Sequence, residues 1–342
     1  MDILRDIVDS SYSFIKPFLF RKDPQQAHEM FSKWCTFLYR KNRDKLLLQH
    51  QKNTLSFPIS NAAGFNKNGS IPPRVLKYLG FSRVVVGTVT NDPWKGNPGV
   101  TIQRYPATES MVNWMGLPGV GAEQVAKNMQ AFGKHGVPIT INFMSTPQKQ
   151  GDDVLQDLKG TILATRDIPH VDRFELNISC PNTHSSSGAF DARRENLSQL
   201  QKMLMVVERY VHPSQEIYLK VSPDSTEKDV DDIIDVVQKY RVKGFVIGNT
   251  STNHDPSFIS PSPGKGGASG NAVYQDSLRT QKMFYERLKK VDKKYTLIAC
   301  GGINSSEKVK ERFSFGATEI QIFTPLIFSG PGLMREIRKK QL

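Results

Sequence analysis

The feature that most restricts the fold of this sequence is a set of eight short apolar runs, separated by stretches with helical periodicity. Apolar residues occupy both faces of most runs, which is typical of parallel strands covered by helices. Eight strand–helix units in one 342-residue chain predict an α/β fold, the (β/α)8 TIM-type barrel, with a small helical extension at the N-terminus. The runs are 58–64, 83–90, 138–143, 173–179, 216–222, 244–250, 296–302 and 319–324.

Nearly every run ends in polar residues or glycine, as in NIS of 173–179 and GNT of 244–250. In a (β/α)8 barrel the carboxyl ends of the strands build the active site. The endings therefore predict an enzyme site at one mouth of the barrel. A doubly wound sheet is the alternative, but its first strand should lead into a glycine-rich dinucleotide fingerprint, and the sequence has none.

Two glycine-rich segments follow late strands: GKGGASG (264–270) and ACGGINSS (299–306). Glycine lets the backbone approach a ligand closely, and Ser305 and Ser306 open a helix whose N-terminal amides can bind an anion. A phosphate site after strands seven and eight recurs in such barrels. We therefore expect a phosphate group here.

Lysines and asparagines gather at the predicted strand ends. Lys67 and Lys220 have no carboxylate partner nearby in the sequence, which favours an anionic ligand or a cofactor that becomes negative. Amide side chains are suited to a planar ring that carries N–H and C=O groups. The asparagines in question are Asn113, Asn177, Asn182 and Asn249.

Composition and charge narrow the possible classes of protein. The hydrophobic fraction of 38% supports a sizeable core, and the formal charge of +13 has no nucleic-acid-binding motif beside it. We interpret the charge as a diffuse basic surface and expect no nucleic-acid partner. Cys35, Cys180 and Cys300 form no CxxC pair, so we expect a reducing compartment and no metal site. The acidic start MDILRDIVD argues against a secretory or mitochondrial leader.

The first 45 residues predict two short helices. Asp23 and Pro24 form a helix start, with Asp23 as N-cap. An amphipathic stripe follows, and the aromatic stretch 14–20 adds a second apolar surface. The pattern leaves open whether these helices pack on the protein or form a membrane-surface element. The stripe consists of Ala27, Met30, Phe31, Trp34, Cys35 and Leu38.

Taken together, these segments resemble the dihydroorotate dehydrogenases over nearly all of the chain. AAGFNKNG and GTVT resemble the family's flavin loops, NWMGLPGVG and GNTST its substrate segments, and NISCPNT its catalytic loop. The resemblance implies an FMN barrel over 46–342, an N-terminal helical element over 1–45, and oxidation of dihydroorotate to orotate.

The resemblance also assigns residues. FMN would contact Ala63, Gly64, Lys67, Thr88, Asn142, Asn177, Lys220, Gly270, Gly301, Gly302, Phe323 and Thr324. The substrate would contact Lys67, Asn113, Trp114, Met115, Gly116, Leu117, Asn177, Asn182, Asn249 and Thr250. Cys180 falls at the position of the family's catalytic base, and Lys67 would assist it by lowering the pKa of the thiol.

The motifs disagree on which class of dihydroorotate dehydrogenase the chain resembles. Segment 18–31 resembles class 2 enzymes, which lie on membranes and pass electrons to quinone, and His28 and Arg104 match positions that line the quinone tunnel. Cys180 resembles the cysteine of class 1 enzymes, where class 2 uses serine. We expect a quinone-dependent, peripheral enzyme on the cytoplasmic side of the cell membrane, or otherwise in the cytoplasm, as a monomer or weak homodimer.

Three segments depart from the family pattern: FMSTPQ (143–148), Gly248 and HSSSG (184–188). They leave two alternatives open. One is the same reaction with fumarate as the electron acceptor. The other is an FMN oxidoreductase that acts on a related dihydropyrimidine.

Overall fold

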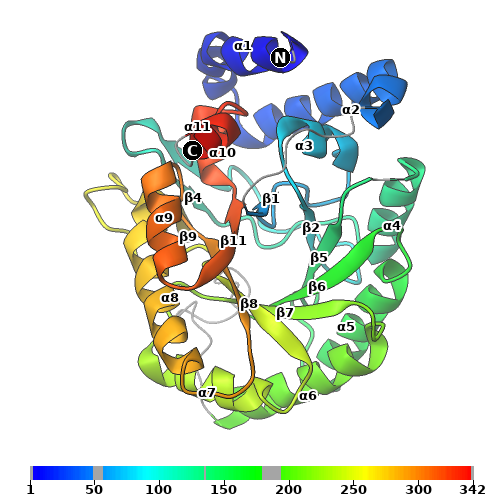
Figure 1. The fold of residues 1–342 in the computed structure, drawn as a ribbon, viewed down its shortest axis with the longest axis vertical. Helices are drawn as coiled ribbons and strands as arrows, with labels where there is room; N and C mark the ends of the chain where they lie inside the picture. The colour runs from blue at the N-terminus through cyan, green and yellow to red at the C-terminus, as the bar shows by residue number, and fades with distance from the viewer. Residues whose placement is uncertain (1–2, 49–56, 135, 179–193, 340–342) are drawn as a thin grey trace.

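The barrel predicted from the apolar runs is present. In the computed structural model, which describes residues 3–48, 57–134, 136–178 and 194–339, eight strands form one parallel sheet in the order β1-β11-β10-β8-β7-β6-β5-β2 (Figure 1). All eight predicted runs are strands. They are β1 (Ile59–Asn61), β2 (Val84–Val89), β5 (Ile139–Phe143), β6 (Val171–Asn177), β7 (Glu216–Val221), β8 (Val242–Ile247), β10 (Thr296–Cys300) and β11 (Ala317–Ile322).

The seam between β1 and β2 is closed by side chains as well as backbone. A parallel bridge joins Ser60 to Arg83, and the Ser82 N–H donates to the Ile59 carbonyl at 2.9 Å. Further along, the side-chain amide of Asn61 takes the place of a neighbouring strand's backbone. Its Nδ2 donates to Val85 O at 2.7 Å, and its Oδ1 accepts from Val85 N at 3.1 Å. The fully buried Asn61 thus satisfies backbone groups of Val85 across the seam.

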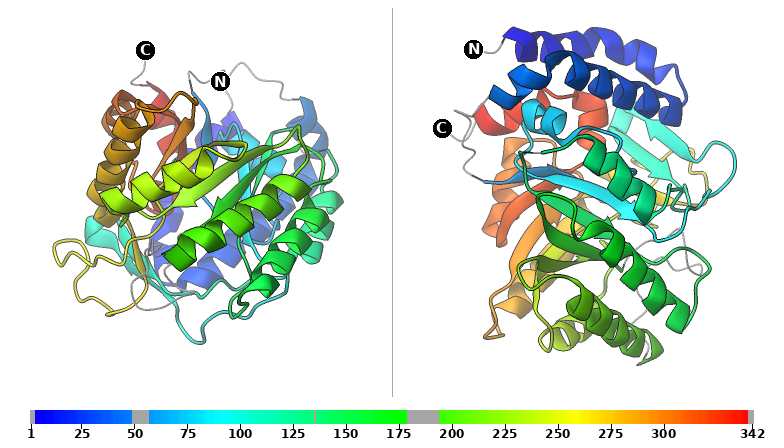
Figure 2. Two further views of the ribbon diagram at one scale, coloured as in Figure 1. Left: turned by 90° about the horizontal axis from the view of Figure 1, so that it is seen from below. Right: turned by 90° about the vertical axis from the view of Figure 1, so that its right-hand side faces the viewer.

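Helices surround the strands and bury their outer faces (Figures 1 and 2). The best-capped of them is α7, where Thr226 and Asp229 exchange hydrogen bonds in a capping box. The helices are α3 (Pro73–Leu79), α4 (Ala122–Ala131), α5 (Asp152–Thr165), α6 (Arg194–Tyr210), α7 (Glu227–Val237), α8 (Tyr274–Leu288), α9 (Ser306–Ser314), α10 (Thr324–Ser329) and α11 (Leu333–Lys339), with 3₁₀ turns η1 (Pro106–Thr108) and η2 (Asn271–Val273).

A small antiparallel sheet, absent from the sequence-based expectation, adds to the barrel. It consists of β3 (Ile102–Tyr105), β4 (Ser110–Asn113) and β9 (Gly267–Gly270) in the order β3-β4-β9. The sequence predicted GKGGASG as a loop, but its last four residues form β9, which pairs with β4 in the register Asn113 to Gly267. The sheet therefore brings the predicted substrate segment and the late glycines together.

The N-terminal helices α1 (Ile3–Phe20) and α2 (Pro24–Leu48) lie side by side against one end of the molecule, close to α3 and α10 (Figures 1 and 2). Asp23 caps α2 as predicted, since its carboxylate accepts from the backbone N–H groups of Gln25 and Gln26. None of the described helices is long and apolar enough to cross a bilayer.

The predicted apolar stripe of α2 is only partly a packing face. Cys35 is fully buried and Phe31 packs edge-on against Phe65 of the barrel, with ring centroids 5.7 Å apart. Met30 belongs to the predicted stripe but is 49% exposed. The predicted stripe is therefore wider than the face of α2 that packs on the barrel, because Met30 faces solvent.

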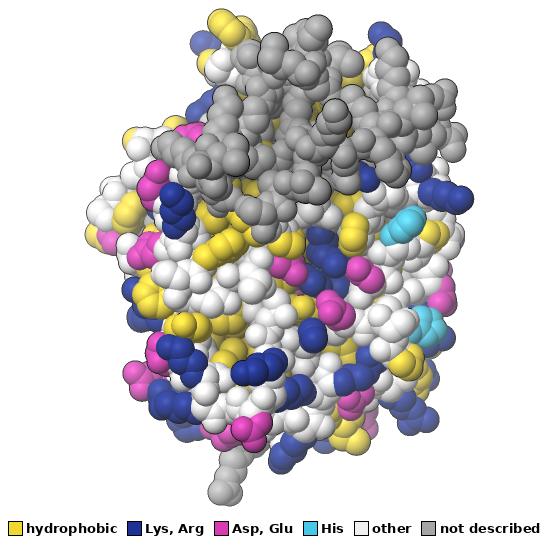
Figure 3. Space-filling view, in the orientation of Figure 1, with side chains coloured by type: hydrophobic (Ala, Val, Ile, Leu, Met, Phe, Trp, Pro, Cys, Tyr) yellow, Lys and Arg dark blue, Asp and Glu magenta, His cyan; other side chains and the backbone are white. Residues whose placement is uncertain are grey.

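The basic charge is spread out on the face seen in Figure 3, where Lys and Arg side chains alternate with acidic and uncharged ones. This distribution agrees with a diffuse basic surface. Within the described part of the chain, no cluster of three or more His, Cys, Asp or Glu could hold a metal ion.

Candidate active site

A cavity opens at the carboxyl ends of the barrel strands. It is open to solvent on one side, and both polar and apolar side chains line it. Its wall contains every predicted cofactor residue except Asn142, and every predicted substrate residue except Trp114 and Asn182. Asn142 is fully buried, and Asn182 lies outside the described residues together with Cys180. The wall also includes Ala62, Ile102, Met111, Ser269, Val273, Cys300, Gln321, Ile322 and Pro325, which sequence reasoning missed.

One side of the cavity is a cradle of glycines from β9 and the end of β10. A Cβ on Gly302 would lie 2.6 Å from the Gly270 carbonyl oxygen, and a Cβ on Gly270 would lie 2.2 Å from the Glu109 carbonyl oxygen. Both residues have positive φ, so no other residue type fits without a shift of backbone. The Lys308 ammonium, which donates to Gly302 O at 3.1 Å, adds positive charge beside the cradle. This arrangement fits the predicted phosphate group.

Amide and hydroxyl side chains line the opposite part of the cavity. Asn177 Nδ2 donates to Thr88 Oγ1 at 3.4 Å, and Asn249 Nδ2 donates to Asn177 Oδ1 at 3.4 Å. The Thr250 N–H donates to Asn249 Oδ1 at 2.9 Å, which fixes the orientation of that amide. Asn113 reaches the same space from β4. The result is a chain of polar groups suited to a ring with several donors and acceptors.

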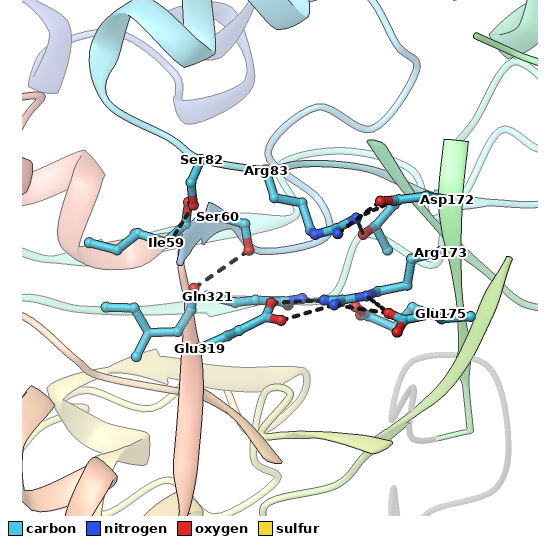
Figure 4. A network of polar contacts seen from close by, with 12 residues as sticks. Ile59, Ser60, Ser82, Arg83, Asp172, Arg173, Glu175, Glu319 and Gln321 are labelled. Atoms are coloured by element: carbon cyan, nitrogen blue, oxygen red, sulfur yellow. Dashed lines mark hydrogen bonds and ion pairs between the residues drawn. The ribbon is translucent and has the colours of Figure 1, made fainter. Parts of the chain in front are cut away.

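Below the cavity floor lies a buried polar network centred on Glu175 of β6. Its carboxylate accepts from Gln321 Nε2 at 2.8 Å (Figure 4). It also accepts from Asn142 Nδ2 at 2.7 Å and lies 3.9 Å from Lys220 Nζ. Asn142 Oδ1 and Gln321 Oε1 are buried and have no hydrogen-bond partner among the described residues. Because buried acceptors of this kind need donors, they fit a planar ring with N–H groups above them.

Polar residues inside two of the predicted strands indicate such a buried network. Polar residues alternate with apolar ones in the runs RFELNIS (173–179) and EIQIFT (319–324), and Glu175 and Gln321 are the central ones. A charged residue in a strand covered on both faces needs a buried partner. The partners could not be read from the sequence, because they come from β5, β7 and β11.

An ion cluster fills the barrel interior at the amino end of the strands. Arg173 pairs with both oxygens of Glu319 at 2.8 and 2.9 Å (Figure 4). It also lies 3.3 Å from a Glu216 oxygen and stacks over the Tyr218 ring. Burial works against the Arg173 charge, but Glu319, Tyr218 and Glu216 together outweigh it and raise the pKa of the guanidinium. The charge of Arg173 is therefore balanced inside the barrel by its carboxylate partners.

Cys300 is a neutral part of the cavity wall. Burial raises the pKa of its thiol, against the opposing field of Lys220. The thiol therefore stays protonated near neutral pH.

His28 and Arg104, predicted to line a quinone tunnel, lie outside the cavity wall but close to it. The His28 ring meets Phe65 edge-on at 5.6 Å, and Phe65 meets Phe323 of the cavity wall at 5.7 Å. Burial lowers the pKa of His28, so its ring is neutral. The Arg104 guanidinium donates to the Leu19, Phe20 and Lys22 carbonyls at the end of α1. Arg104 thus joins α1 to β3.

Comparisons with known proteins agree with this geometry. Residues 46–342 match the family described as dihydroorotate dehydrogenase. A protein of Thermosynechococcus vestitus named dihydroorotate dehydrogenase (quinone) is 30% identical, with 97% of this chain and 96% of that protein covered. A protein of the same name from Idiomarina loihiensis is also 30% identical, with 95% and 98% covered.

Solved structures support the fold. The crystal structure of a DHODH from Eimeria tenella in complex with ferulenol superposes with a TM-score of 0.76 at 22% identity, covering 94% of this chain and 91% of that one. A ligand-free structure from the same organism gives 0.75 at 23% identity. With the family match over the whole barrel and the cavity at its mouth, the chain belongs to the dihydroorotate dehydrogenase family.

Proposed function

We propose that this protein oxidises dihydroorotate to orotate with FMN as its cofactor and passes the electrons to a quinone. The observation that carries the proposal is the cavity at the barrel mouth, where a glycine cradle, two lysines and a row of amides face one space. Family membership gives the reaction, and the names of the 30% identical relatives favour quinone as the acceptor.

FMN fits the residues present. Its phosphate would lie in the cradle of Gly270, Gly301 and Gly302, near Lys308. Its ring would meet Lys220 and the Gln321 oxygen on the cavity wall. Bound there, FMN supplies the ring that accepts a hydride from the substrate. The Lys220 ammonium, buried in the floor, stabilises negative charge that develops on the ring side of the cavity.

The substrate would bind between the amides and Lys67. The carboxylate of dihydroorotate pairs with the Lys67 ammonium, and its ring N–H and C=O groups pair with Asn113, Asn177 and Asn249. Cys180, outside the described residues, is the proposed base that takes the proton from C5 of the substrate. A thiol suits this role because it ionises near pH 8.5 when unperturbed, far below an alcohol.

The N-terminal element is the proposed route to the acceptor. The aromatic rings of His28, Phe65 and Phe323 form a continuous contact from α2 to the cavity wall. Phe14 and Phe18 on α1 are 77% and 67% exposed. An amphipathic helix with exposed aromatic residues and flanking basic ones is suited to lie in a membrane interface, where quinones dissolve. We therefore place residues 1–45 at the cytoplasmic face of a membrane.

Side-by-side assays test the acceptor. The purified yellow protein is mixed with dihydroorotate and either a short-chain quinone or fumarate, and orotate is followed by absorbance. We expect fast turnover with the quinone and turnover at least a hundredfold slower with fumarate. Turnover with fumarate alone would overturn the quinone and membrane assignments together, and reduction of the flavin only by another dihydropyrimidine would overturn the substrate.

A double variant tests the membrane surface separately. Phe14→Ser with Phe18→Ser should weaken binding to anionic lipid vesicles by about 30-fold or more, since each exposed ring contributes roughly 1–2 kcal/mol when it enters an apolar phase. Activity with a water-soluble quinone should persist. Unchanged sedimentation with vesicles would show that this face does not contact lipid.

A further inference from the structure

The barrel interior contains a carboxylate that the proposed reaction does not use. Side chains of β6 alternate along the strand, and Arg173, Glu175 and Asn177 face the interior at three successive levels. Arg173 belongs to the ion cluster at the closed end, and Asn177 belongs to the cavity wall. Glu175 lies between them and is fully buried.

The contacts of Glu175 determine the orientation of two amides. An ionised carboxylate can only accept hydrogen bonds, so Asn142 and Gln321 must each turn their NH₂ group toward it, at 2.7 and 2.8 Å. Their carbonyl oxygens then point away from Glu175. These are the two oxygens that have no partner among the described residues, and Gln321 lies on the cavity wall.

The same carboxylate also balances a buried charge. Lys220 Nζ lies 3.9 Å from Glu175 Oε1, and the side chains are 3% and 0% exposed. An isolated ammonium at this depth would be strongly destabilising, whereas a pair with hydrogen bonds to neighbouring amides is tolerated. With Glu175 in place, the cavity floor carries a neutral pair in place of a bare positive charge.

We propose that Glu175 is a positioning residue for the flavin ring: it makes Asn142 and Gln321 hydrogen-bond acceptors, and it moderates the charge of Lys220, which sets the reduction potential of the bound flavin. The inference rests on the proposed FMN cofactor. The floor then selects a ring with N–H donors. It also holds the potential below the value that an unpaired Lys220 would impose, because positive charge favours the more negative, reduced ring.

The test is the midpoint potential of the flavin in Glu175→Gln holoenzyme. The variant keeps the size of the side chain but removes its charge, so Lys220 is left unbalanced. We expect a more positive potential, with at least a tenfold shift in the two-electron reduction equilibrium, which corresponds to about 30 mV. Glu319→Gln is the matched control, since it removes a carboxylate from the same barrel interior, next to Arg173. We expect its potential to equal the parent's.

A second variant tests the acceptor role and does not require Glu175→Gln to fold. Gln321→Leu removes an acceptor from the cavity wall, and it should weaken binding of FMN to the flavin-free protein three- to tenfold, measured by quenching of flavin fluorescence. Equal potentials in Glu175→Gln and parent, or unchanged FMN affinity in Gln321→Leu, would overturn the proposal while leaving the FMN assignment intact. A parent protein that binds no flavin would overturn both.

Discussion

At the scale of single residues, Gly248 shows why this chain departs from its family. The resemblance leads one to expect threonine at this position, yet Gly248 has φ of +122° and a Cβ there would lie 2.2 Å from the Cys300 carbonyl oxygen. The Ser277 hydroxyl occupies the same space, since it donates to Ile247 O and to Cys300 O. Glycine is therefore required by the way α8 packs against β8 and β10.

Substitution of Gly248 should reveal this packing. We expect Gly248→Ala to lower the free energy of unfolding by about 2–4 kcal/mol, from backbone strain and overpacking combined. Gly99→Ala is the control, since Gly99 also has positive φ but no atom within 4 Å of a built Cβ. It should lose only about 1 kcal/mol. Urea unfolding followed by circular dichroism measures both, and equal losses would contradict the steric argument.

The thiol of Cys180 makes a second prediction at this scale. Replacement by serine keeps a proton-accepting group but raises the pH at which it ionises, so Cys180→Ser should retain some activity with its pH optimum moved upward. The pH profile of kcat/KM for dihydroorotate oxidation measures the shift. Cys300→Ser, the same change in the cavity wall, should leave the optimum in place. A Cys180→Ser profile that overlays the parent's would show that Cys180 is not the base.

At the scale of elements, α2 is held to the barrel partly by a histidine that must stay neutral. Burial lowers the pKa of His28 below 6.5, while in the unfolded chain the ring titrates near 6.5. As the pH falls below 6.5, the unfolded state binds a proton that the packed state does not, so the packing loses stability. The cost arises because burial keeps the charged ring away from water, and the backbone hydrogen bond with Phe65 offsets only part of it.

Acidification should therefore loosen the N-terminal helices. We expect proteolytic removal of α1 and α2 to be several-fold faster at pH 5.5 than at pH 7.5, compared at equal protease activity. His28→Gln, which keeps a hydrogen-bonding group but cannot gain this charge, should show a smaller change. The same acceleration in both proteins would assign the pH effect to other groups.

The small sheet marks the limit of prediction at this scale. The eight barrel strands were recognisable because buried parallel strands are nearly continuous apolar runs. The strand segments IQRY, SMVN and GASG have no such pattern, and β9 pairs with β4 from more than 150 residues away in sequence. Its hydrogen bonds depend on a contact that no local signal encodes.

At the scale of the whole molecule, the sequence was most informative where function restricts it. Most of the predicted strand-end glycines, lysines and asparagines line one cavity, because the barrel brings the carboxyl ends of its strands together. The contacts of the buried Glu175 could not be predicted. Its partners Asn142, Lys220 and Gln321 lie on three other strands, which come close to β6 only when the sheet closes into a barrel. The roles assigned to His28, Arg104 and Cys180 stay predictions.

The seam beside β1 has a consequence for how the chain is made. β1 pairs with β11, and the Ser60 hydroxyl donates to the carbonyl of Ile320, 260 residues later in the chain. Loop closure over such a separation is slow. Strands β2 to β10 leave the ribosome before β11, which pairs with β1, has been made. During synthesis the unfinished barrel is an open sheet with two bare edges, and this nascent form is the one most exposed to aggregation and most dependent on chaperones.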